Sequence, residues 1–90
     1  MDVTKLIEEL YTMLEMRQNA VCSIEFLELN RAQEKFKHIQ TAGLEDAIPL
    51  LFQADIDQWT VTDISTDVYM MQDFPGCSNY FIHIRLMRCL

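Results

Sequence analysis

The sequence predicts an α+β domain in which about three N-terminal helices pack on one face of a C-terminal antiparallel β-hairpin. Apolar residues recur at helical spacing in the first half of the chain, whereas β-branched and aromatic residues dominate from Trp59 onward. Only two glycines and two prolines occur among the 90 residues, which indicates mostly regular structure. A chain of this length is expected to form one compact domain spanning residues 1–90.

The first predicted helix runs from about Val3 to Gln18. Its apolar residues follow the spacing that places side chains on one face of a helix. Asp2 is a suitable N-cap, because its carboxylate can accept hydrogen bonds from the first free amides. Asn19 is the expected end. The residues of the apolar face are Val3, Leu6, Ile7, Leu10, Met13 and Leu14.

The segment after Asn19 is ambiguous, because residues 24–29 fit neither the helical nor the strand period cleanly. A second helix from about Ser23 to Thr41 is favoured, since the polar run 30–37 is rich in helix formers. The apolar residues of this helix would form a stripe. A strand at residues 24–29 is the alternative. Gly43 lies where a left-handed cap would end the helix.

The third predicted helix begins near Asp46, a good N-cap, and ends near Ala54. Pro49 would then lie in the first turn, where its missing amide costs nothing. The side chains expected to face inward are Leu44, Ile48, Leu51 and Phe52.

The β-hairpin is predicted from two strands, residues 59–71 and 80–90, joined by a turn at residues 74–77. Pairing residues whose numbers sum to 150 puts an almost wholly apolar face on the helices. The other face then places Asp67 beside His83 and Ser65 beside Arg85. Trp59 and Val61 would lie on that outer face unless a bulge intervenes. Both edges of this two-stranded sheet would be unpaired, so a homodimer could form through the hairpin edge.

Charge restricts the classes of partner. The net charge is −7, and the 32 residues 43–74 hold seven acids and no lysine or arginine. This argues against direct binding of nucleic acid, which needs a basic surface. An acidic surface suits a basic protein partner. These acids are Glu45, Asp46, Asp55, Asp57, Asp63, Asp67 and Asp73.

Targeting signals are not apparent in the sequence. Without a run of about 18 apolar residues, no transmembrane helix and no membrane partner are expected. The N-terminus lacks the pattern of a signal peptide. The three cysteines are odd in number and widely spaced, so they are expected to be reduced thiols. These features predict an intracellular, cytoplasmic protein.

The sequence contains no complete catalytic signature, so an enzyme is not expected, and no cofactor or metal is assigned. Asp55 and Asp57 are the best candidates for a hard cation such as magnesium, but two carboxylates form a weak motif. A divalent-metal enzyme is therefore the least favoured hypothesis.

The predicted partner-binding residues form three groups. Asp55, Asp57, Asp63 and Asp67 would steer a basic partner. Tyr69, Met71, Phe81 and Met87 would form an apolar centre on the outer face of the hairpin, with Asp67, Asp73 and Arg85 as its polar rim. His83, opposite Asp67, would tune hairpin stability or partner docking.

The favoured function is a small acidic protein-binding module that inhibits or antagonises a basic, nucleic-acid-acting protein. By analogy of size and charge, this resembles an antidote to a toxin, an immunity protein or a phage-encoded inhibitor of a host enzyme. The alternative is a structural or regulatory homodimer built by edge-strand pairing.

Overall fold

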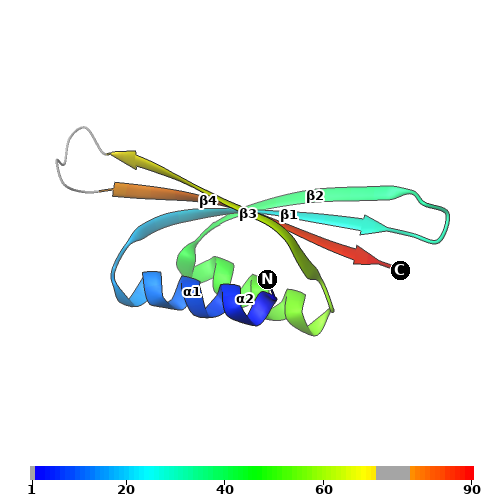
Figure 1. Ribbon diagram of the computed structural model, residues 1–90, viewed down its shortest axis with the longest axis horizontal. Coiled ribbons are helices and arrows are strands. Elements are labelled where there is room, and N and C mark those ends of the chain that lie inside the picture. Colours follow the sequence, from blue (N-terminus) through cyan, green and yellow to red (C-terminus); the bar gives the residue numbers. More distant parts are fainter. Residues whose placement is uncertain (1, 71–77) are drawn as a thin grey trace.

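The computed structural model describes residues 2–70 and 78–90, which form two helices on one face of a four-stranded mixed sheet (Figure 1). The α+β class is confirmed, but the predicted arrangement of three helices on a hairpin is wrong. The elements are α1 (Val3–Glu15), β1 (Asn19–Leu29), β2 (Lys35–Gly43), α2 (Leu44–Ile56), β3 (Thr60–Met70) and β4 (Ser78–Cys89).

The strand order is β2-β1-β4-β3. β1 pairs with β2 in an antiparallel and with β4 in a parallel arrangement, and β3 pairs with β4 in an antiparallel arrangement. The last strand is therefore central, and β1 occupies the edge of β4 that the hairpin prediction left unpaired. Among the described residues, the edges of the sheet are β2 and β3.

Helix α1 begins where the sequence predicts. Asp2 is the N-cap, and its Oδ1 accepts a hydrogen bond from the Lys5 amide at 2.8 Å. The helix ends at Glu15, and Arg17 takes a left-handed conformation with φ 56°. The amide of Gln18 then donates to the Met13 carbonyl at 3.1 Å, which closes the helix end before β1 starts.

The second predicted helix is wrong, because residues 19–43 form the β1–β2 hairpin. In β1, Cys22 and Ile24 are fully buried while their neighbours are not, which is the period of a strand. Asn30 closes the connection, since its Oδ1 accepts from the amides of Ala32 and Glu34 at 3.0 and 2.9 Å. Burial between two partner strands overrides the helix propensity of the polar run. The alternative strand at residues 24–29 was correct but too short.

Helix α2 starts earlier than predicted. Gly43 is its N-cap, with φ −68°, rather than the C-cap of a preceding helix, and it provides no side-chain hydrogen bond. Pro49 consequently lies inside the helix and not in its first turn. The helix ends at Ile56, two residues beyond the predicted end.

The β3–β4 register differs from the predicted one by two residues. Ile64 faces Ile84, and the register shifts between Val61 and Asp63. A two-residue displacement keeps the side chains of β4 and of residues 63–67 in β3 on their predicted faces. The bulge turns Val61 inward, where it is 8% exposed, so the position that the predicted register placed on the outer face belongs to the core. The predicted turn at residues 74–77 lies outside the described residues.

The core lies between the helices and one face of the sheet. Both helices contribute buried residues to this core. On the exposed side of the helices, the rings of Tyr11 and Phe52 meet edge-on with centroids 6.3 Å apart. No described helix covers the other face of the sheet (Figure 1). The helical core residues are Val3, Leu6, Ile7 and Leu10 in α1, and Leu44, Ala47, Ile48, Leu51 and Ala54 in α2.

Candidate functional site

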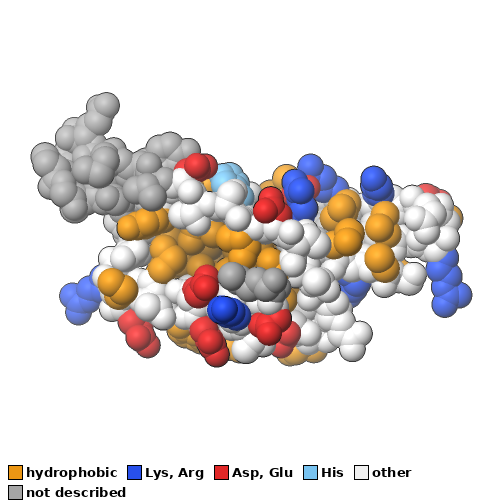
Figure 2. Space-filling model, in the orientation of Figure 1, with side chains coloured by type: hydrophobic (Ala, Val, Ile, Leu, Met, Phe, Trp, Pro, Cys, Tyr) orange, Lys and Arg blue, Asp and Glu red, His pale blue; other side chains and the backbone are white. Residues whose placement is uncertain are grey.

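Charge is divided between the two layers. The helices with their ends, residues 2–18 and 44–58, hold eight acids and two bases, whereas the other described residues hold five of each. Figure 2 shows a group of acidic side chains over the helices, whereas acidic and basic side chains both lie along the sheet. The negative field of this protein therefore belongs to the helix layer and not to the sheet.

A groove lies between α2 and the part of the β1–β2 hairpin that projects beyond the helices, residues 26–38 (Figure 1). Its volume is about 380 Å³. Phe26, Phe36 and His38 line it from the sheet, and Leu50 and Ala54 line it from α2. Because the helices are shorter than the strands, the helix-facing side of the projecting hairpin stays open and its apolar side chains reach the surface.

Aromatic contacts fix the floor of the groove. The Phe26 ring stacks on His38 and meets Trp59 edge-on, with centroids 5.2 Å apart in both pairs. The Arg88 guanidinium lies 4.5 Å from the centre of the Trp59 ring. Glu28 accepts hydrogen bonds from this guanidinium, including one from Nε at 3.1 Å. Arg88 is therefore neutralised within the chain.

The C-terminal end of α2 carries two acids, Asp55 and Asp57, whose carboxylates form no ion pair within residues 2–70 and 78–90. Asp57 caps the helix and lines the groove, and its Oδ1 accepts a hydrogen bond from the Gln53 amide nitrogen at 3.2 Å. Asp55 is exposed on the same end. The last turn of α2 has no basic residue. Arg88 Nη1 donates a hydrogen bond to the Asp57 backbone carbonyl at 3.2 Å, so the partial negative charge of the helix C-terminus already has one cation beside it. The carboxylates of Asp55 and Asp57 add two negative charges at the same end.

The outer face, the side of the sheet away from the helices, carries a row of charges across all four strands. Glu25 of β1 accepts from Lys37 of β2 at 3.0 Å and from Arg85 of β4 at 2.8 Å. The two cations lower the pKa of Glu25, with Arg85 as the larger cause. Glu25 in turn raises the pKa of Arg85, and the charge of Asp63 on β3, opposite Arg85, adds to this.

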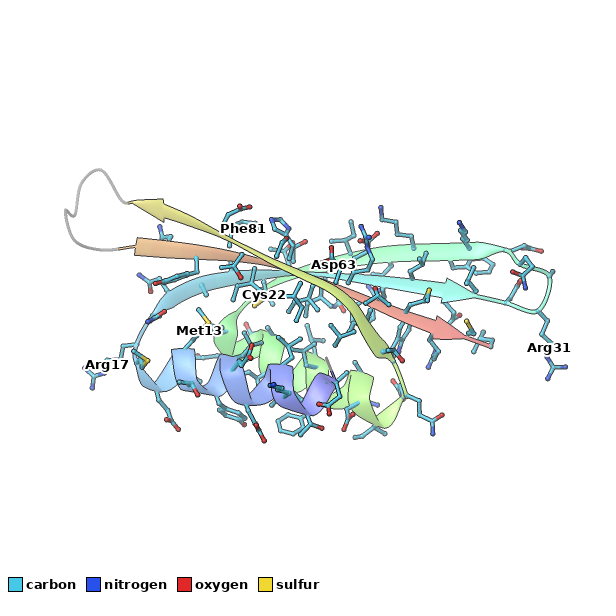
Figure 3. All side chains as sticks on the ribbon, in the orientation of Figure 1. Met13, Arg17, Cys22, Arg31, Asp63 and Phe81 are labelled. Atoms are coloured by element: carbon cyan, nitrogen blue, oxygen red, sulfur yellow. The ribbon has the colours of Figure 1, made fainter. Side chains whose placement is uncertain are left out.

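The predicted site residues separate into two groups on opposite sides of the molecule. Asp63 and Phe81 lie on the outer face (Figure 3). Asp67, His83 and Arg85 share this face, where Asp67 Oδ2 lies 3.5 Å from His83 Nε2. Asp55 and Asp57 lie at the end of α2, on the helix side. Tyr69 belongs to β3, but its side chain and the whole of Met71 lie outside what is described. One continuous acidic surface is therefore not formed.

The groove residues were missed by sequence reasoning. Phe26, Phe36 and His38 fall in the segment assigned to a helix, where their shared strand face cannot be recognised. Their signal is the alternation of the hairpin strands, which puts even-numbered side chains of β2 on the helix side. The predicted register placed Trp59 on the outer face, whereas it lines the groove on the helix side.

The structure offers little for catalysis in the described residues. Asp55 and Asp57 are two positions apart on a helix, so their carboxylates point in different directions. No group of three or more His, Cys, Asp or Glu residues that could hold a metal occurs in residues 2–70 and 78–90. Burial raises the pKa of the Cys22 thiol to about 11, which makes it a poor nucleophile.

Similarity to known proteins does not assign a function to this chain. No protein family model, no curated protein and no solved structure matches this chain. Neither described helix is long and apolar enough to cross a bilayer.

Proposed function

We propose that this chain is a protein-binding module that holds a basic segment of another protein in the groove between α2 and the projecting hairpin. The observation that carries the proposal is the pairing of an aromatic floor with Asp57, a groove-lining carboxylate that forms no ion pair among the described residues, with Asp55 exposed at the same helix end. An apolar side chain of the partner would fill the groove, and a neighbouring lysine or arginine would meet Asp57 and Asp55.

The electrostatics support a basic partner and not an acidic one. The helix layer that borders the groove has six more acids than bases. Such a surface raises the association rate of cationic partners and disfavours anionic ones. The two cations that line the groove are already paired, Arg88 with Glu28 and Lys37 with Glu25, and they offer little to an anion.

The groove also has the anatomy of a binding hot spot. Phe36 is 53% exposed although it is a large apolar residue, and Trp59 is half-buried beside it. Aromatic side chains in a partly enclosed pocket with a polar rim carry most of the energy of typical interfaces. A partner that contacts nucleic acid through the bound segment would be blocked while it occupies the groove, which is how the expected inhibitory function would arise.

The test uses a short synthetic peptide with lysines on both sides of a single leucine, fluorescently labelled for anisotropy. Phe36→Asp should weaken binding at least about tenfold, because it removes a hot-spot aromatic residue. Asp57→Asn should weaken binding by roughly twofold to fivefold, as expected for one exposed charge pair. High salt should weaken the wild-type complex.

Matched controls decide the location. Asp46→Asn removes an exposed acid from the other end of α2 and should leave the affinity unchanged. A peptide with glutamates in place of the lysines should not bind. Equal losses for Asp46→Asn and Asp57→Asn would show diffuse attraction to the helix layer and overturn the groove as the site. Absence of binding to the lysine peptide would count against the proposed function itself.

A further inference from the structure

The outer face of the sheet presents apolar side chains that no described element covers. Alternation along β1 and β4 buries one set of side chains under the helices and turns the other set outward. Ile39 is 55% exposed and Val21 is 38% exposed on this side. Figure 3 shows Phe81 pointing away from the helices, whereas Cys22 points toward them. The outward apolar residues in β1, β2 and β4 are Val21, Leu27, Leu29, Ile39, Phe81 and Met87.

The charges on the outer face are balanced within the chain. Glu25 is bound by Lys37 and Arg85, Asp63 lies opposite Arg85, and Asp67 lies 3.5 Å from His83. A partner with a large charge of one sign would gain little from such a face. A partner that carries both signs in the same arrangement would suit it better.

We propose that the outer face binds the outer face of a second copy of this chain, which gives a two-fold symmetric dimer of packed sheets. A two-fold interface pairs one surface patch with a copy of itself, so a charged patch can be self-complementary only when it carries both cations and anions. The row of Lys37, Glu25 and Arg85 carries both.

The distribution of charge allows only this side of two copies to approach without repulsion. The helix layers hold the excess of acids, and the sheet regions hold equal numbers of acids and bases. In a face-to-face dimer the helix layers point outward. Packed sheets lie about 10 Å apart, and each helix layer adds about 10 Å, so the acidic layers are about 30 Å from each other. That is several Debye lengths at physiological salt, about 8 Å each.

The area of the face is sufficient. Four strands at about 4.8 Å spacing and about 11 residues at about 3.3 Å give a face of about 700 Å². Stable protein interfaces bury about 800 Å² on each partner. The sheet is therefore about the size that a specific dimer needs.

Edge-strand pairing, the dimer expected from the sequence, is less well supported. The β4 edge is occupied by β1. The β3 edge carries the bulge at Val61 and Asp63 and a second acid, Asp67. The β2 edge begins with Lys35 and Lys37. Bulges and charges are the features that discourage edge-to-edge pairing of strands.

The test compares two substitutions on the same strand. Ile39 and Phe36 are 55% and 53% exposed in β2, but they lie on opposite faces of the sheet. Sedimentation of the wild-type chain should show a species of twice 10.6 kDa that dissociates on dilution. Ile39→Asp should weaken the dimer at least about tenfold, whereas Phe36→Asp should leave it intact.

The outcomes separate the possible interfaces. Circular dichroism shows whether each variant is folded, and Val21→Asp is a second variant on the outer face. A wild-type chain that stays monomeric at high concentration overturns the proposal. Loss of the dimer in both Phe36→Asp and Ile39→Asp points to pairing of β2 edges and also overturns it. Phe36→Asp is expected to weaken peptide binding and to leave dimerisation intact. A failure of the dimer proposal therefore leaves the groove proposal standing.

Discussion

At the residue scale, Glu25 is the centre of the outer face. It is the one carboxylate among the described residues that accepts from two cations of neighbouring strands, Lys37 at 3.0 Å and Arg85 at 2.8 Å. Both cations favour its ionised form and lower its pKa, with Arg85 contributing most. A carboxylate with this environment makes the stability of the fold depend on pH.

The sign of this dependence follows from linkage. The folded pKa of Glu25 lies below its unfolded value of about 4.3, so ionised Glu25 stabilises the fold above that value. The contribution is lost as pH falls through the folded pKa. We therefore expect Glu25→Gln to be less stable than wild type at neutral pH and the difference to shrink in acid. Urea denaturation at a series of pH values measures this.

The control for Glu25→Gln is Glu9→Gln, which removes one negative charge from the exposed face of α1. The stability difference between Glu9→Gln and wild type should not shrink in acid in the way that is expected for Glu25→Gln. A Glu25→Gln difference that stays constant from neutral pH into acid would show that the two ion pairs do not stabilise the folded state.

Sequence reasoning at this scale placed the outward residues of β3 and β4 correctly. Asp63, Asp67, His83 and Arg85 lie on the outer face because strand alternation leaves two choices, and only one keeps the charges in water. The partner of Arg85 was not predicted. Glu25 is 60 residues away in the chain, and only the parallel pairing of β1 with β4 brings them together.

At the element scale, the two helices begin in different ways. Asp2 caps α1 with a side-chain hydrogen bond of 2.8 Å, whereas Gly43 caps α2 without one. Gly43 has φ −68° and ψ 172°, a conformation open to any residue. A Cβ added at Gly43 would meet no atom within 4 Å. A residue with a capping side chain at position 43 can therefore improve the N-cap of α2.

We expect Gly43→Ser to stabilise the protein by about 0.5–1 kcal/mol. Serine is a better N-cap than glycine by a few tenths of a kcal/mol, and a residue with a Cβ reduces the freedom of the unfolded chain. Thermal or urea denaturation measures the change. Gly43→Ala, which keeps the entropic gain without the hydroxyl, is the matched control and should give a smaller gain. A destabilised Gly43→Ser would mean that the strand end at β2 needs glycine for another reason.

The β1–β2 hairpin is the reason that helices and strands were predicted less well in the first half of the chain than in the second. Residues 30–37 contain good helix formers, and isolated propensity favours a helix there. The strand wins because β1 is central and buries Cys22 and Ile24 completely. Hydrophobic burial of this kind exceeds the differences in helix propensity, which are only tenths of a kcal/mol per residue.

At the scale of the whole molecule, the fold has two layers and stability is not uniform. β1 and β4 lie in the centre of the sheet, and their inward residues are buried under the helices. The connection at residues 30–34 and the adjoining part of β2 lie beyond the helices, and residues 35–39 are exposed. This part has few buried contacts and should open most easily.

Hydrogen exchange tests this gradient. We expect amides in the middle of β1 and β4 to exchange only on global unfolding, and those of residues 30–37 to exchange fastest among the described strands and turns. Mass spectrometry of peptic fragments resolves the two regions. Equal protection of β2 and β1 would contradict the gradient and would indicate that the β2 edge is paired in solution.

The two proposed interfaces lie on opposite sides of the molecule. The groove opens on the acidic helix side, and the outer face is electrically balanced. A dimer formed through the outer faces would leave both grooves accessible. It would present two sites to a partner, which strengthens binding when the partner also has two basic segments.

The sequence by itself determined the α+β class, the start of α1, the existence of α2 and the faces of β4 and of residues 63–67 in β3. These depend on local periodicity and capping, which operate over a few residues. The tertiary structure alone decided that β1 is a strand, that β4 is central, and that Phe26, Phe36 and Trp59 form a groove. The physical reason is that strand pairing joins residues far apart in the chain, so its burial energy is absent from any local window.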